Sequence, residues 1–283
     1  MLSGAPEGFD ALVLAEVASK GRDDVLFVAR DDVRMARMAD ALTFFASRLE
    51  RLEFPAWDCL PYDRVSPKAE IVGRRIDALT RMLEKPGDGP GRVVLTTVSA
   101  LVQRLPPRAV FSQAVLKMRP GDELDPAMLV EILANNGYGR SETVMEPGEF
   151  AVRGGIVDVF PPALPEPLRL DFFGDQLEAV RSFDPASQRT IGEAGQAVFK
   201  PVSEVLLRED TIARFRTGYR TLFGAAKGVN PLYEAVSDGR RHLGMEHWLA
   251  LYYDRLETLL DYLPGARVVL DHQAEEARDS RLE

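Results

Sequence analysis

The chain has 283 residues, of which 46% are apolar and 28% are charged, and its formal net charge at pH 7 is −9. This composition is typical of a globular protein with about two domains, which argues against an intrinsically disordered chain. The excess of acidic side chains also opposes broad, non-specific binding to a nucleic-acid backbone.

Helical and strand patterns alternate in residues 1–118. We expect helices over residues 9–19, 33–49 and 68–83, and strands over residues 25–29 and 92–97. Strands that are separated by helices are typical of βαβ units, in which the strands form a parallel sheet. The sequence therefore predicts a parallel α/β domain for residues 1–118.

Residues 119–203 differ in both pattern and charge. Between residues 119 and 200 there are 7 basic and 14 acidic side chains, a net charge of −7. Short segments that are rich in strand-forming residues and separated by turns are typical of an antiparallel sheet. We predict a small, inserted α+β domain that is mainly antiparallel β. Because of its acidic charge, this domain is poorly suited to binding DNA.

The expected elements of this middle domain are one helix and three strands. The helix is predicted over residues 126–135, with Asp125 as its N-cap and Gly137 in a left-handed conformation after its end. The strands are predicted between residues 146 and 189, with a bulge or a turn at Gly154-Gly155.

Residues 204–283 return to helical patterns. Helices are expected over residues 212–222 and near residues 232–236. The segment 249–272 is predicted to hold one or two helices and then a strand at residues 267–270. We expect this strand to rejoin the first sheet, which would make the middle domain an insertion.

The start of the chain offers one candidate nucleotide site. A phosphate-binding loop needs two glycines, a lysine for the phosphate charge and a hydroxyl for Mg²⁺. When Gly8 is aligned with the second glycine, Phe9 stands at the lysine position and Asp10 at the hydroxyl position, and Gly4 lies one residue after the position of the first glycine. From the residues alone we interpret the segment as an ordinary capped helix start, with a degenerate phosphate loop as the alternative that a family relationship would have to support.

Other kinds of chemical site are not indicated. The sequence contains no nucleophile elbow and no metalloprotease motif, and its three histidines lack metal-ligand spacing with the single cysteine, Cys59. We therefore expect no catalytic residue, cofactor or metal. Glu7, Asp10 and Glu16 interrupt the apolar run that a signal peptide requires, so we expect a cytoplasmic protein with no membrane segment.

The strand pattern at residues 168–173 indicates a binding surface. Its even-numbered residues are apolar and are predicted to face the core, which leaves Phe173 on the polar face with Arg169. An exposed aromatic side chain near an arginine is typical of an interface hot spot. The alternative is that Phe173 packs under the next turn while Arg169 pairs with Asp171.

The middle domain contains the segments MEPGEFAVRGGIVDVFP and LRLDFFGDQLEAVRSFDPASQRT, and the first domain contains FPAWDCLPYDRVSPKAEIVGRRIDAL. These segments resemble a module shared by two bacterial nucleotide-excision-repair proteins, UvrB and the transcription-repair coupling factor. The resemblance extends over essentially all 283 residues. It implies a degenerate, helicase-like α/β domain in two parts, residues 1–118 and 204–283, around a UvrA-binding domain at residues 119–203.

Two differences from UvrB favour the coupling factor. UvrB keeps an intact phosphate loop, whereas this loop is altered at Phe9 and Asp10. UvrB also has a long tyrosine-rich hairpin, for which the short path from Cys59 to Pro67 leaves no room. The resemblance implies an isolated amino-terminal module of a DNA-translocating ATPase whose other domains bind RNA polymerase and double-stranded DNA.

The resemblance also implies a partner and the residues that contact it. In the family the middle domain binds UvrA through residues that match Arg153, Arg169 and Phe173. The implied function is recruitment of UvrA to stalled RNA polymerase, without catalysis by this chain. A UvrB-like module that binds damaged DNA and a residual nucleotide-binding enzyme are the alternatives.

Overall fold

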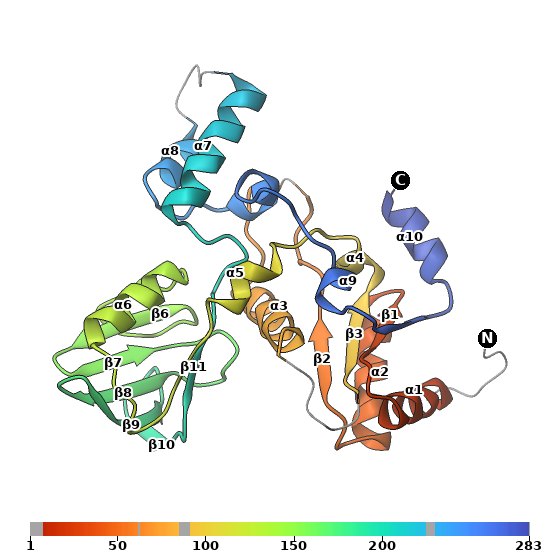
Figure 1. Cartoon of the computed structure of the whole chain (residues 1–283), viewed down its shortest axis with the longest axis horizontal. Helices are drawn as coiled ribbons and strands as arrows, with labels where there is room; N and C mark the ends of the chain where they lie inside the picture. Colours follow the sequence, from red (N-terminus) through yellow and green to blue (C-terminus); the bar gives the residue numbers. More distant parts are fainter. Residues whose placement is uncertain (1–7, 62, 85–90, 225–229, 283) are drawn as a thin grey trace. The chain divides into compact units, whose positions relative to one another are not determined.

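A computed structural model describes residues 8–61, 63–84, 91–224 and 230–282 (Figure 1). The chain divides into two compact units. The first consists of Met1–Trp57, Ala78–Leu105 and Glu257–Glu283, and the second of Asp58–Asp77 and Pro106–Leu256. Within the described residues, no helix has both the length and the apolar character needed to cross a membrane.

The first unit is built on a four-stranded parallel sheet. Its strand order is β12-β1-β3-β2, with β12 at Arg267–Leu270, β1 at Val25–Ala29, β3 at Val93–Thr97 and β2 at Arg51–Phe54. Strands β1 and β3 are buried along their whole length, as parallel strands with covered faces usually are. Helices α1 (Phe9–Lys20) and α2 (Asp32–Phe45) pack against them in one apolar core.

The elements predicted for residues 1–118 and the closing strand at residues 267–270 are largely confirmed. Helix α1, helix α3 (Ala69–Met82), strand β1 and strand β3 lie where the patterns predict them, and β12 rejoins the sheet by pairing with β1. The prediction for α2 was too long, because the helix ends at Phe45. Leu49 continues the apolar spacing although it lies beyond the helix, and its side chain is buried. The short strand β2 was not predicted.

The second unit contains a six-stranded sheet of order β10-β9-β8-β7-β6-β5. The strands are β5 (Gly139–Arg140), β6 (Glu149–Arg153), β7 (Ile156–Val159), β8 (Leu168–Phe173), β9 (Gln176–Phe183) and β10 (Thr190–Glu193). All neighbouring pairs are antiparallel except β5 with β6. Two further strands, β4 (Leu116–Met118) and β11 (Ala197–Phe199), form a separate antiparallel pair.

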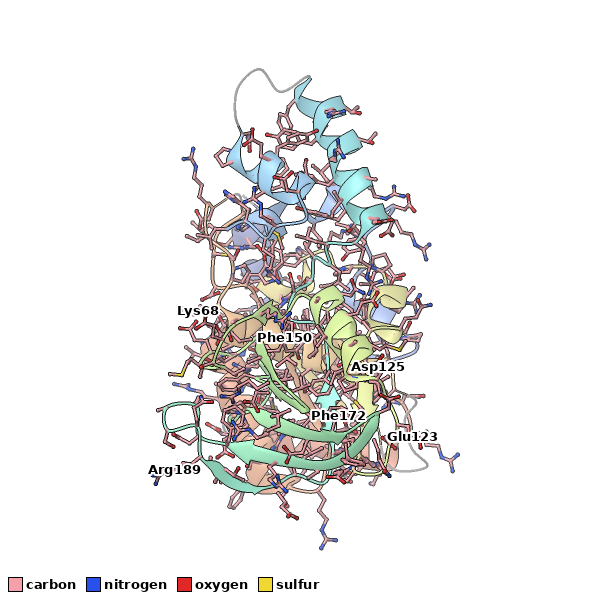
Figure 2. The ribbon with its side chains drawn as sticks, turned by 90° about the vertical axis from the view of Figure 1, so that its left-hand side faces the viewer. Lys68, Glu123, Asp125, Phe150, Phe172 and Arg189 are labelled. Carbon is pink, nitrogen blue, oxygen red and sulfur yellow. The ribbon has the colours of Figure 1, made fainter. Side chains whose placement is uncertain are left out.

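Helix α6 (Pro126–Asn135) packs on one face of this sheet (Figure 1). Leu129 and Leu133 join the core with strand residues that include Phe150 and Phe172, both labelled in Figure 2. The predicted helix ends are confirmed: the Asp125 carboxylate accepts from a backbone N–H at 2.8 Å, and Gly137 has φ +88°.

The glycine pair corrects the predicted number of strands. Gly154 and Gly155 form a two-residue turn between β6 and β7, so residues 146–189 hold four strands, β6 to β9, rather than three. Gly154 has φ +61°, which favours glycine, and a Cβ atom at Gly155 would lie 2.6 Å from the Phe172 carbonyl oxygen. The chain therefore reverses here instead of continuing as one bulged strand.

The remaining helices are mostly short. They are α4 (Val98–Leu101), α5 (Arg108–Ser112), α7 (Glu209–Phe223), α8 (Pro231–Ser237), the 3₁₀ helix η1 (Met245–Leu251), α9 (Leu259–Tyr262) and α10 (Ala274–Leu282). The predictions for α7 and α8 are confirmed. The segment 249–272 is less helical than predicted, because the backbone of Glu257 bonds to that of Leu105 in both directions, at 2.9 and 2.8 Å.

Candidate partner-binding surface

The face of the six-stranded sheet opposite α6 carries charged side chains in cross-strand rows. In β8, burial alternates along the strand, which confirms the predicted inner and outer faces. Phe173 ends the strand on the outer face with 76% of its surface exposed. The sheet ends at β10, and in Figure 2 Arg189, just before that strand, extends outward from this edge.

Asp158 in β7 lies directly opposite Arg169 in β8. Arg169 donates Nε–H to Oδ1 at 2.7 Å and Nη2–H to Oδ2 at 3.0 Å, so the two groups form a bidentate pair. The Asp158 side chain is fully buried. Because a buried carboxylate without a counter-charge is strongly unfavourable, this aspartate depends on its arginine neighbours.

Arg153 is the second arginine on the same carboxylate. It ends β6 and donates from Nη2 to Oδ2 of Asp158, while 47% of its side chain stays exposed. The register places Ala151 opposite Asp158, so Arg153 reaches the carboxylate diagonally. The structure thus brings two of the sequence-predicted residues, Arg153 and Arg169, together on one buried acid.

Arg169 is held on three sides. Its guanidinium group lies over the Phe183 ring, 4.6 Å from the centroid, and its Nη1 donates to the Gln188 carbonyl oxygen at 3.3 Å. The hydrogen bonds to Asp158 raise the pKa of the Arg169 guanidinium. Only 16% of this side chain is exposed, so Arg169 is much less open to solvent than Arg153.

Phe173 shares the face and the end of the sheet with Arg153. The β6–β7 turn that follows Arg153 and the β8–β9 turn that follows Phe173 lie at the same end of the strands, because β6, β7 and β8 are antiparallel neighbours. The alternative packing considered from the sequence is wrong in both parts. Phe173 is exposed, and Arg169 pairs with Asp158 whereas Asp171 pairs with Arg181.

Sequence reasoning missed Asp158 and Arg181. Arg181 in β9 lies opposite Arg169, so the row across three strands runs from Asp158 through Arg169 to Arg181. A signal for Asp158 was present, since it is the charged residue inside the apolar strand Ile156–Val159. A charged side chain inside a buried strand requires a partner, although the sequence does not show which one.

The residues of the predicted degenerate loop lie in the first unit. Gly4 falls outside the described residues, while Gly8, with φ +87°, is the N-cap of α1 and is followed by the partly exposed Phe9. Asp10 accepts a hydrogen bond from Nη2 of Arg34, which is in the first turn of α2.

Arg34 also contacts a second carboxylate. Its Nε donates to Oδ1 of Asp271 at 3.2 Å, and both of these side chains are largely buried. Asp271 directly follows β12, and α2 follows β1, so Arg34 lies at the carboxyl ends of these two adjacent strands. In open parallel sheets, ligands bind at this edge where the strand order reverses, as it does between β12 and β1.

Metal binding has no visible basis in the part of the chain that the structure describes. Within it, no three side chains of His, Cys, Asp or Glu are grouped so that they could hold an ion. The outer face of the six-stranded sheet offers the chemistry of contact: charge-assisted hydrogen bonds from arginine and burial of an exposed aromatic ring.

Comparison with known proteins gives two results. A family model described as the UvrB interaction domain matches residues 116–204. The transcription-repair-coupling factors of Rickettsia prowazekii, Haemophilus influenzae and Escherichia coli are 34, 33 and 31% identical over 90, 100 and 92% of the chain. The chain spans about a quarter of these relatives, 22, 24 and 22% of their lengths.

Proposed function

Because this chain is homologous to part of the transcription-repair-coupling factors and contains a UvrB interaction domain, we propose that it recruits UvrA to sites where RNA polymerase has stalled. The recruiting domain is residues 119–203, close to the matched segment. Residues 1–118 and 204–283 form the scaffold around it. Contacts with RNA polymerase and double-stranded DNA, and ATP-driven translocation, belong to other parts of the full-length protein.

The arrangement of side chains on the outer face of the six-stranded sheet is the observation that supports this proposal. It combines two arginines on one buried carboxylate with an exposed phenylalanine at the same end of the sheet. Arginine and aromatic side chains are enriched among the residues that dominate binding energy at protein interfaces. We assign Arg153, Arg169 and Phe173 as the residues that bind UvrA.

The charge of the domain supports a specific protein partner rather than DNA. Residues 119–200 carry a net charge of −7, so the arginines stand within acidic surroundings. Such a pattern attracts a partner that offers carboxylates to the arginines and basic groups to the surrounding acids, and it repels a polyanion. We propose that the chain has no catalytic activity of its own.

A calorimetric titration of the chain with UvrA, without ATP, tests the proposal. We expect saturable binding, and we expect Arg153→Ala and Phe173→Ala each to weaken it by about 2 kcal/mol or more, the scale of interface hot spots. Phe44→Ala is the matched control, because Phe44 is an exposed phenylalanine (83%) of the first unit. Absence of binding by the unaltered chain would refute the function, and unchanged affinity in both variants would refute the site.

A further inference from the structure

Asp158 is at the centre of the partner-binding surface although it is not exposed on it. Both carboxylate oxygens accept hydrogen bonds, Oδ1 from Arg169 and Oδ2 from Arg169 and Arg153. Its side chain is fully buried, whereas Arg153 is about half exposed. One acid thus holds two basic side chains, and the more accessible of them faces the solvent.

The surroundings of Asp158 strengthen these interactions. Its cross-strand neighbour Ala151 belongs to a small buried cluster that also contains Val144, Phe160 and Phe183. The Phe183 ring lies under the guanidinium group of Arg169. Hydrogen bonds between charged groups are stronger where water is excluded, and such a site also penalises any rearrangement that leaves the acid unpaired.

We propose that Asp158 is the positioning residue of this surface: it holds the guanidinium groups of Arg153 and Arg169 in their binding arrangement before the partner arrives. The inference rests on the proposed function. An arginine that is ordered only on binding loses side-chain entropy at that moment, whereas one already fixed does not. Asp158 therefore raises affinity without touching the partner.

This arrangement also defines the chemistry that the partner must present. Two arginines around one aspartate carry one net positive charge, and the exposed part of that charge is on Arg153. The surface fits a single carboxylate of UvrA at Arg153, next to an apolar recess that takes up the Phe173 ring.

The first test is Asp158→Asn, which keeps the shape of the side chain and removes its charge. We expect its affinity for UvrA to fall by about tenfold or more, as expected when two long side chains must be ordered on binding. Asp171→Asn is the matched control, because Asp171 lies on the same face and pairs with Arg181 instead. We expect it to change the affinity less than about threefold. An equal loss in both variants would overturn the proposal.

Double variants separate positioning from a general loss of structure. In the Asp158→Asn background, Arg153→Ala should cost much less affinity than in the unaltered chain, because Arg153 is no longer held. Phe173→Ala should cost the same factor in both backgrounds, since no contact joins Phe173 to Asp158 among the described interactions. Loss of the Phe173 effect as well would indicate a disrupted domain and would overturn the inference.

A measurement on the unaltered chain does not depend on how the variants fold. Nitrogen-15 relaxation of the arginine side chains should show the Arg169 and Arg153 guanidinium groups to be ordered without UvrA, and Arg189 at the sheet edge to be mobile. Equal mobility of all three would overturn the proposal even if UvrA binds. Failure of the unaltered chain to bind UvrA, with ordered arginines, would instead refute only the proposed function.

Discussion

Arg75 of helix α3 donates from Nε and Nη2 to the carboxylate of Glu204, at 2.5 and 3.3 Å, and both side chains are buried. Glu204 is the last residue of the segment that matches the UvrB interaction domain, whereas Arg75 precedes that segment in the chain. The pair therefore links the first segment of the second unit, Asp58–Asp77, to the residue that ends the matched domain. Lys200 adds a second link, 2.7 Å from Asp77 of the same helix.

Removal of one partner of this pair should destabilise the second unit. Glu204→Ala leaves the Arg75 guanidinium buried without its carboxylate, so we expect the free energy of unfolding to fall by about 3–5 kcal/mol. Urea unfolding followed by circular dichroism measures the change. Arg240→Ala, which breaks the exposed pair with Asp238, should cost less than about 1 kcal/mol. Equal losses of unfolding free energy in Glu204→Ala and Arg240→Ala would show that burial does not make the Arg75–Glu204 pair more stabilising than an exposed ion pair.

The contact between α3 and the proline turn after β7 gives a second prediction. A Cβ atom at Gly73 would lie 2.8 Å from Cβ and 3.2 Å from the carbonyl carbon of Pro162. We expect Gly73→Ala to lower the unfolding free energy by about 1–3 kcal/mol through overpacking, although alanine is the better helix former. At Gly195 no atom lies within 4 Å of the added Cβ, so Gly195→Ala is the control. A stabilising Gly73→Ala would contradict this close packing.

Arg34 should contribute to the stability of the first unit. Without its guanidinium, the carboxylates of Asp10 and Asp271 lose a shared partner, and Asp271 is buried. We expect Arg34→Ala to lower the unfolding free energy by about 2 kcal/mol, the scale for hydrogen bonds to charged groups. Thermal unfolding checks this against Lys20→Ala, which removes an exposed helical pair and should cost about 0.5 kcal/mol or less.

The same ion pairs predict how the chain responds to nucleotide. Asp10 at the start of α1 would repel phosphates, and Arg34 is already engaged by two carboxylates at the edge where a ligand would bind. We expect calorimetric titration with ATP and Mg²⁺ to give no saturable heat. Measurable binding at millimolar concentrations or below would mean that a nucleotide site persists and would revive the interpretation of the chain as an enzyme.

DNA binding gives the last prediction. The acidic interaction domain and the net charge of −9 oppose contacts with phosphate. We expect filter binding with undamaged and damaged duplexes to show little retention at physiological salt. Strong retention that falls steeply with salt would favour the UvrB-like alternative, because such a slope reports the release of counterions from phosphate contacts.

Local signals were sufficient for much of the fold. The cap residues of α6 and the apolar run of β1 are read from adjacent residues, and both elements have the predicted bounds. The sequence patterns gave wrong helix predictions in two places, and in both of them a tertiary contact, not a helix, determines the local structure. Buried Leu49 extended the apparent period of α2, and the backbone pairing of Glu257 with Leu105 replaced an expected helix.

The proposed partner-binding surface shows the same division. Alternation along β8 was enough to put Phe173 and Arg169 on the outer face, because side-chain direction in a strand depends only on its own period of two. The resemblance to a known module added Arg153. Only the tertiary structure decided that both arginines share the carboxylate of Asp158, because that contact depends on the register of three strands whose pairing is set by the core beneath them.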